Sequence, residues 1–241
     1  MTSDPNSVIT AGVTRQIKTS TWDEPLFINR NLVASAPGVT LYASNDFSYA
    51  GRYFGSILVG QSGNNILIGA KGWDIVTGGT GNDLAKAGIG RDILTGGLGS
   101  DELWGGHGWN TFLSEIDNSA DLLVIRSDQW VVNQISGKAG NNQNGEKCDI
   151  IEGLDTTDRI MILGSDTKDL SFNLNAVAHG IAGIGIYAKG SLEALYTGGD
   201  LSLDQIKAMT IGDGSEAGMG HQIWSYDWTQ HPGTMTPTYF R

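Results

Sequence analysis

The sequence predicts an all-β fold: a parallel β-roll or β-solenoid of nonapeptide repeats, with a β-rich carboxyl-terminal flanking region and an extended tail. Nonapeptide units run from Gly60 to Leu113 without insertion or deletion, and short strand-like runs alternate with turns after them. The 35 glycines are about twice ordinary usage, while only 5 prolines accompany them, which argues against collagen-like chains. Internal repeats of this kind mark architectures in which each unit buries its apolar face against its neighbours.

The repeated units share three positions. They read GQSGNNILI, GAKGWDIVT, GGTGNDLAK, AGIGRDILT, GGLGSDELW and GGHGWNTFL. The fourth position is always glycine: Gly63, Gly72, Gly81, Gly90, Gly99 and Gly108. The sixth position is acidic or amide: Asn65, Asp74, Asp83, Asp92, Asp101 and Asn110. The eighth is apolar: Leu67, Val76, Ala85, Leu94, Leu103 and Phe112. Each unit therefore predicts a turn followed by a short strand with its eighth residue inward.

The turn chemistry points to a hard cation. Glycine adopts backbone dihedrals that other residues avoid, and it lets main-chain carbonyls converge. A carboxylate at the sixth position supplies anionic oxygen, which suits Ca²⁺ better than softer transition metals. Two units make one full coil, so units n and n+2 stack on the same side and a cation can sit between successive turns. A roll that keeps the turn shape without metal is the alternative, but four consecutive aspartates favour calcium.

The repeats resemble those of the RTX (repeats-in-toxin) family, whose unit is G-G-x-G-x-D-x-U-x, with U a large apolar residue. This resemblance implies a right-handed parallel β-roll with Ca²⁺ between same-side turns. The implied side-chain ligands are Asp74 with Asp92, Asp83 with Asp101, and, at more weakly occupied sites, Asn65 with Asp83 and Asp92 with Asn110. Main-chain ligands are expected at the fourth-position glycines Gly72, Gly81, Gly90 and Gly99.

Four segments are expected along the chain. They are an arm or capping segment at 1–50, the calcium-binding roll at 51–120, a β-rich flank at 121–211 and an aromatic tail at 212–241. The block GRYFGSILV from Gly51 keeps the apolar end of a unit but lacks the acidic turn, which suggests a cap.

The flank is predicted in more detail. Strands are expected at 121–127, 158–164, 170–174, 183–188 and 192–196. A short helix is expected at 201–209 with Ser202 as its cap, and an exposed polar loop at 136–147. The flank is also similar to the segment that follows the repeats in bacterial, especially cyanobacterial, RTX-type proteins. That similarity implies a region that caps the roll and nucleates its folding.

No catalytic signature is present. The sequence contains neither H-E-x-x-H nor G-x-S-x-G, and its four histidines show no ligand spacing. The single cysteine, Cys148, is expected to be an idle buried thiol. Asp155 and Asp158 form a D-x-x-D that favours a turn between strands, with a peripheral Ca²⁺ as the alternative. We therefore do not expect an enzyme.

Charge and hydropathy limit the partners. A net charge of −11 disfavours nucleic acid, because phosphate binding requires a basic surface. No stretch is apolar enough to span a membrane, and the amino terminus lacks the apolar region of a classical signal peptide. We expect a calcium-binding structural module, extracellular or surface-exposed, that assembles with other proteins or with itself. The alternatives are a virion or appendage component with the roll as its tip, and a secreted enzyme of unrecognised type. Carbohydrate binding is left open.

Overall fold

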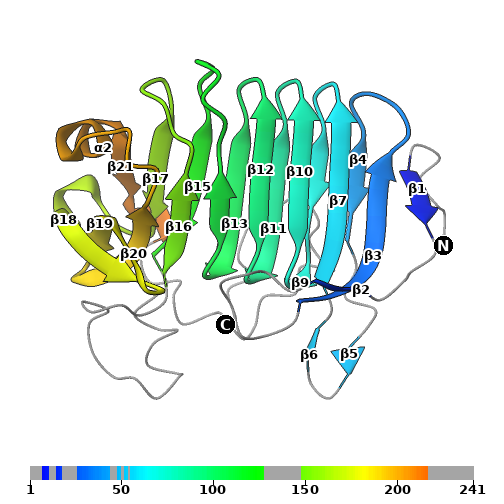
Figure 1. Ribbon diagram of the computed structural model, residues 1–241, viewed down its shortest axis with the longest axis horizontal. Coiled ribbons are helices and arrows are strands. Elements are labelled where there is room, and N and C mark those ends of the chain that lie inside the picture. The colour runs from blue at the N-terminus through cyan, green and yellow to red at the C-terminus, as the bar shows by residue number, and fades with distance from the viewer. Residues whose placement is uncertain are drawn as a thin grey trace.

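In the computed structural model, two long sheets stand face to face along the longest axis of the molecule (Figure 1). The structure describes residues 7–10, 15–17, 26–43, 48–49, 52–53, 55–127 and 148–216, with side chains described for 31–43, 55–127 and 148–215. Within these residues the strands are mostly parallel, so the predicted all-β parallel roll is confirmed.

The first sheet has eleven strands among the described residues. They are β1 (Ser7–Thr10), β2 (Arg15–Ile17), β3 (Leu26–Ala34), β7 (Gly55–Ser62), β10 (Ile75–Thr80), β12 (Ile93–Leu98), β14 (Thr111–Leu113), β16 (Asp149–Glu152), β18 (Leu170–Ala178), β19 (Ile181–Ala188) and β20 (Ser191–Tyr196). The second, eight-stranded sheet contains β4 (Thr40–Tyr42), β8 (Ile66–Ile68), β9 (Lys71–Gly72), β11 (Leu84–Gly90), β13 (Glu102–Gly108), β15 (Leu122–Arg126), β17 (Arg159–Leu163) and β21 (Thr210–Asp213). A separate hairpin pairs β5 (Ser48–Tyr49) with β6 (Arg52–Tyr53).

Successive repeat units alternate between the two sheets. In the first sheet Ile75 pairs with Ile93, which pairs in turn with Thr111. In the second, Leu84 pairs with Glu102. Each of these partners lies 18 residues further along the chain, so two nonapeptides make one coil. This register places equivalent turn residues directly above one another.

The core consists of two stacks of apolar side chains, one from each sheet, that lie between the sheets. The eighth residue of every unit is fully buried, as are the residues in register with it before and after the repeats. These residues, each 0% exposed, are Leu58, Leu67, Val76, Ala85, Leu94, Leu103, Phe112 and Leu123. The coils are thereby held at fixed spacing by apolar burial.

The carboxyl-terminal flank continues the sheets rather than forming a separate layer. β15 and β17 extend the second sheet and β16 extends the first, while β18, β19 and β20 form an antiparallel meander at its edge (Figure 1). The five strands predicted in the flank are confirmed, although β18 is longer than expected because it pairs with β19 past a bulge.

The short helix is also confirmed, as α2 (Leu203–Met209). Ser202 caps it: the Ser202 hydroxyl accepts a hydrogen bond from the Gln205 N–H, and the Gln205 side chain accepts one from the Ser202 N–H. None of the described helices is long and apolar enough to cross a membrane.

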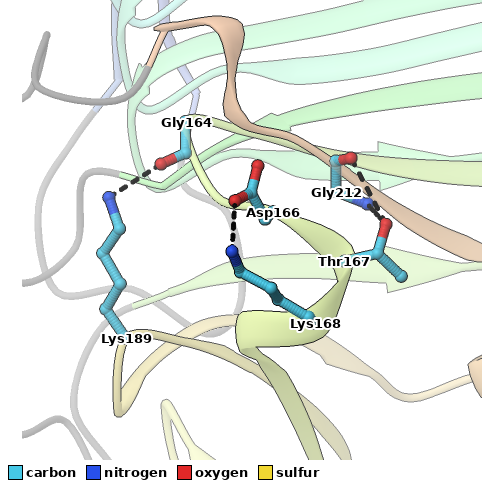
Figure 2. A network of polar contacts seen from close by, with 6 residues as sticks. All are labelled: Gly164, Asp166, Thr167, Lys168, Lys189 and Gly212. Carbon is cyan, nitrogen blue, oxygen red and sulfur yellow. Dashed lines mark hydrogen bonds and ion pairs between the residues drawn. The ribbon is translucent and has the colours of Figure 1, made fainter.

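Polar contacts tie the turns of the flank together (Figure 2). The Lys189 ammonium donates to the Gly164 carbonyl at 2.8 Å, which links the β19–β20 turn to the end of β17. Gly212 N–H donates to the Thr167 hydroxyl at 2.8 Å. The polar loop at 136–147 and most of the tail, 217–241, lie outside the described residues. The four segment boundaries stay predictions.

Candidate metal centre

Turn residues of the sixth position form two columns, one on each edge of the roll. The first column contains Ser56, Asp74, Asp92, Asn110 and Asp149. Each side-chain Oδ1 accepts a hydrogen bond from the main-chain N–H of the residue below it in the column. The distances are 2.5 Å from Ser56 N to Asp74, 2.7 Å from Asp74 N to Asp92, and 3.0 Å from Asp92 N to Asn110.

The second column contains Asn65, Asp83, Asp101, Asp121 and Asp158. The same N–H to Oδ1 contacts recur, at 2.6 Å from Asn65 N, 2.7 Å from Asp83 N and 2.9 Å from Asp101 N. One oxygen of each carboxylate is therefore used to hold successive coils in register. The other oxygen decides whether a cation fits.

That second oxygen lacks a partner in three of the repeat aspartates. Asp83 Oδ2, Asp92 Oδ2 and Asp101 Oδ2 are buried and accept no hydrogen bond. A buried ionised oxygen left without a donor or cation costs several kcal/mol, so native proteins rarely contain one. In Asp74, by contrast, Oδ2 accepts from Ala70 N–H at 2.9 Å. The three orphaned oxygens fit a bound hard cation.

The first glycine of a unit lies against this oxygen. A Cβ added to Gly78 would be 2.4 Å from Asp83 Oδ2, and one added to Gly96 would be 2.3 Å from Asp101 Oδ2. A side chain at either position would displace the carboxylate. The glycine therefore keeps open the space that the second oxygen faces.

Fourth-position glycines turn their carbonyls along the stacking direction. The Gly72 carbonyl oxygen lies 1.5 Å from the place of a Cβ on Gly90, and the Gly81 oxygen lies 2.1 Å from that of a Cβ on Gly99. Gly99 also has φ +125°, which side chains rarely adopt. Main-chain oxygens of one coil thus face the next coil near the carboxylates, which is the donor set that calcium prefers.

Electrostatics show how poorly these carboxylates tolerate their own charge. Burial raises the pKa of Asp74 and of Asp101 to about 7, from an ordinary 3.8. Burial also raises the pKa of Asp83. The pKa of Asp92 lies well above its usual range because of burial and the adjacent negative charge of Asp74. A divalent cation would relieve both the burial cost and the repulsion.

Beyond the repeats, the columns continue into residues that the nonapeptide register does not reach. Asp121 and Asp158 extend the second column, and Asp149 extends the first. The Asp121 Oδ2 accepts from the Ser114 hydroxyl at 2.5 Å. The Asp158 Oδ2 accepts a hydrogen bond from Asp155 N–H at 2.8 Å. This contact lies in the turn that the D-x-x-D motif predicted. Protein donors thus satisfy these two carboxylates.

Other polar groups do not add a side-chain metal cluster. Among the residues described, no three His, Cys, Asp or Glu side chains converge as a metal-binding group. Main-chain carbonyls would therefore supply most of the oxygens around a cation between the turns. Cys148 is buried, and burial raises its thiol pKa well above the usual range, as expected of an idle thiol.

Comparison with known families agrees with this geometry. The family described as RTX calcium-binding nonapeptide repeat (4 copies) matches residues 53–85 and again residues 87–119. No curated protein and no solved structure matches this chain significantly.

Proposed function

From the premise that this chain carries RTX-type repeats, which bind Ca²⁺, we propose that calcium locks the coils of the roll in register and does no chemistry. The orphaned second oxygens of Asp83, Asp92 and Asp101 carry this proposal. They lie between coils, in turns whose glycines bring main-chain oxygens close. The chain is a calcium-binding structural module, and the metal acts as a clamp between neighbouring turns.

The proposed ligand pairs are those implied by the repeats. Asp83 with Asp101 has two orphaned oxygens, and Asp74 with Asp92 has one. We propose main-chain ligands from the fourth-position glycines that accompany these aspartates: Gly72, Gly81, Gly90 and Gly99.

The asparagine positions support weaker occupancy. Asn65 Oδ1 accepts from Val39 N–H, while Asn65 Nδ2 donates to Asp83 Oδ1 at 2.8 Å. Asn110 Oδ1 accepts from Asp92 N–H. Each amide oxygen is thus engaged by the main chain, and the –NH₂ group occupies the place of the second carboxylate oxygen. An –NH₂ group cannot bind a cation.

Replacing Asp83 and Asp92 with alanine is expected to weaken calcium binding about 100-fold or more, because one carboxylate ligand is lost in each column. Isothermal titration calorimetry with CaCl₂ measures the affinity and the number of ions bound. The matched control replaces two exposed acids, Asp200→Ala with Asp204→Ala, and removes the same charge away from the turns. Unchanged affinity in the Asp83/Asp92 variant would exclude these residues as ligands.

Assembly with other proteins, or with itself, outside the cell or on its surface is a further part of this proposal. Large apolar side chains at the turns support it: Leu98 is 55% exposed and Ile116 is 61% exposed, 18 residues apart in consecutive turns of one edge. Multi-angle light scattering in saturating calcium is expected to show a mass above the 25.6 kDa monomer at micromolar concentration. A monomeric mass under these conditions would contradict self-assembly. A mass that does not increase on mixing with extracellular protein fractions would contradict assembly with other proteins.

A further inference from the structure

The turn that follows the last repeat departs from the glycine pattern. Glu115 and Asp117 stand 18 residues after Gly97 and Gly99, which occupy the second and fourth positions of their unit. The second position is glycine in four of the six units, and the fourth is glycine in all six. Their carboxylates reach back to the preceding coil: Gly97 N–H donates to Glu115 Oε2 at 2.9 Å, and Gly99 N–H donates to Asp117 Oδ2 at 3.0 Å. Two acidic side chains thus enter a region that glycines keep clear in the interior coils.

Interior coils have no room for such a side chain. A Cβ on Gly79 would lie 2.1 Å from the Gln61 carbonyl oxygen, and one on Gly97 would lie 1.9 Å from the Gly79 oxygen. The Cβ direction at this position therefore points at the main chain of the preceding turn. Glu115 does not share the positive φ of Gly79 and Gly97, and its side chain extends back so that its carboxylate reaches the N–H of Gly97.

Asp101 faces that same turn. It is 2% exposed, and its Oδ2 has no hydrogen-bond partner. This oxygen lies 2.3 Å from the place of a Cβ on Gly96, while Glu115 binds the N–H of the adjacent Gly97. Burial raises the pKa of Asp101, and the negative charges of Asp121, Asp83 and Glu115 raise it further. Two anionic groups therefore converge on one turn.

We propose that Asp101 and Glu115 bind a calcium ion together between the last repeat turn of the second column and the turn that follows it, with main-chain carbonyls as the remaining ligands. This inference rests on the proposed calcium-clamp function and adds a ligand from outside the repeat motif. This would be the last calcium site along this column, because the Asp121 Oδ2 beyond it already accepts from the Ser114 hydroxyl. Carboxylates from two successive coils would hold the ion at the 2.3–2.6 Å typical of calcium.

Glu115→Gln tests this site in the full chain. Equilibrium dialysis with ⁴⁵Ca²⁺ is expected to show one fewer tightly bound ion than in the unmodified protein, or one site weakened about tenfold or more. Asp200→Asn is the control, because it makes the same carboxylate-to-amide change at an exposed residue in the loop before α2. Glu115→Gly, which restores the repeat glycine, is expected to lose the same site.

A crystal structure of the unmodified protein grown with calcium gives a second readout that needs no variant. An anomalous peak that contacts both Asp101 and Glu115 would support the site, and its absence at saturating calcium would overturn it. Binding by both Glu115 variants that equals the control would also overturn it while leaving the calcium clamp intact. If the unmodified protein binds no calcium at all, the clamp itself fails.

Discussion

Chelation of calcium at pH 7.5 is expected to unfold the repeat coils. The orphaned oxygens of Asp83, Asp92 and Asp101 would then be buried anions without a counter-charge. Each site held at 100 times its Kd adds about 2.7 kcal/mol to stability, so three sites would add about 8 kcal/mol. That is comparable with the whole stability of an ordinary domain. Far-UV circular dichroism and thermal melts with CaCl₂ or EGTA measure the effect.

The cation that restores the fold is a first control. Calcium is expected to reverse the effect of EGTA, whereas magnesium is not, because magnesium needs near-octahedral geometry and keeps much of its water. Hydrogen exchange adds a spatial test. Protection is expected to be lost in β10 to β13 but retained longer in β17, since the carboxylate in the turn before it, Asp158, already has protein donors for both oxygens. Identical melts with and without EGTA would contradict the prediction.

The pH dependence of stability is a second control, and the pKa values give its direction. In the metal-free fold the pKa of Asp74 and Asp101 is about 7, against 3.8 for an ordinary aspartate. Between these values the folded state binds more protons than the unfolded chain, so metal-free stability falls as pH rises from about 4 to about 7. Calcium must also displace those protons. The difference in melting temperature between calcium-loaded protein and protein freed of calcium by dialysis is therefore expected to shrink at pH 5. A difference as large as at pH 7.5 would contradict this.

The fold was accessible from the sequence because one spacing serves both structure and site. A unit of nine residues fixes which side chains point inward, and two units per coil stack Asp74 under Asp92 and Asp83 under Asp101. The burial of the eighth-position residues needed no further information, since an uninterrupted repeat places them in one inward-facing stack on each sheet. Helix α2 was also predictable from a local signal, because the side chains of Ser202 and Gln205 form its amino-terminal cap.

The sequence did not predict the remaining members of the columns, because the nine-residue spacing ends after the last repeat. Asp121 follows Asp101 by 20 residues, and Asp158 follows Asp121 by 37, so neither falls on the nine-residue register. A local signal does exist: D-L-L-V from Asp121, D-I-I-E from Asp149 and D-R-I-M from Asp158 all keep the aspartate two residues before an inward apolar side chain. Glu115 had no such signal, because its role depends on which oxygen of Asp101 lacks a partner.

Gly90→Ala is expected to destabilise the roll by more than about 3 kcal/mol even in saturating calcium. An added Cβ would lie 1.5 Å from the Gly72 carbonyl oxygen and 2.9 Å from Asp92 Oδ1. Neither neighbour can retreat easily, because both belong to the stacked turns: Asp92 Oδ1 holds the Asp74 N–H at 2.7 Å. The coil must therefore separate from the one before it, which also spreads the proposed ligands. Urea denaturation measures the loss.

Gly180→Ala separates this steric effect from the loss of glycine itself. Gly180 has φ +78° and no atom within 4 Å of an added Cβ, so its replacement strains only the backbone of the β18–β19 turn. That strain costs about 1–2 kcal/mol. Calcium affinity is expected to fall in Gly90→Ala and to stay unchanged in Gly180→Ala, because only the first substitution moves a turn of the columns. Equal losses of stability in the two variants would mean that the coils stack less tightly than these contacts indicate. Calcium could then not hold neighbouring coils at a fixed spacing.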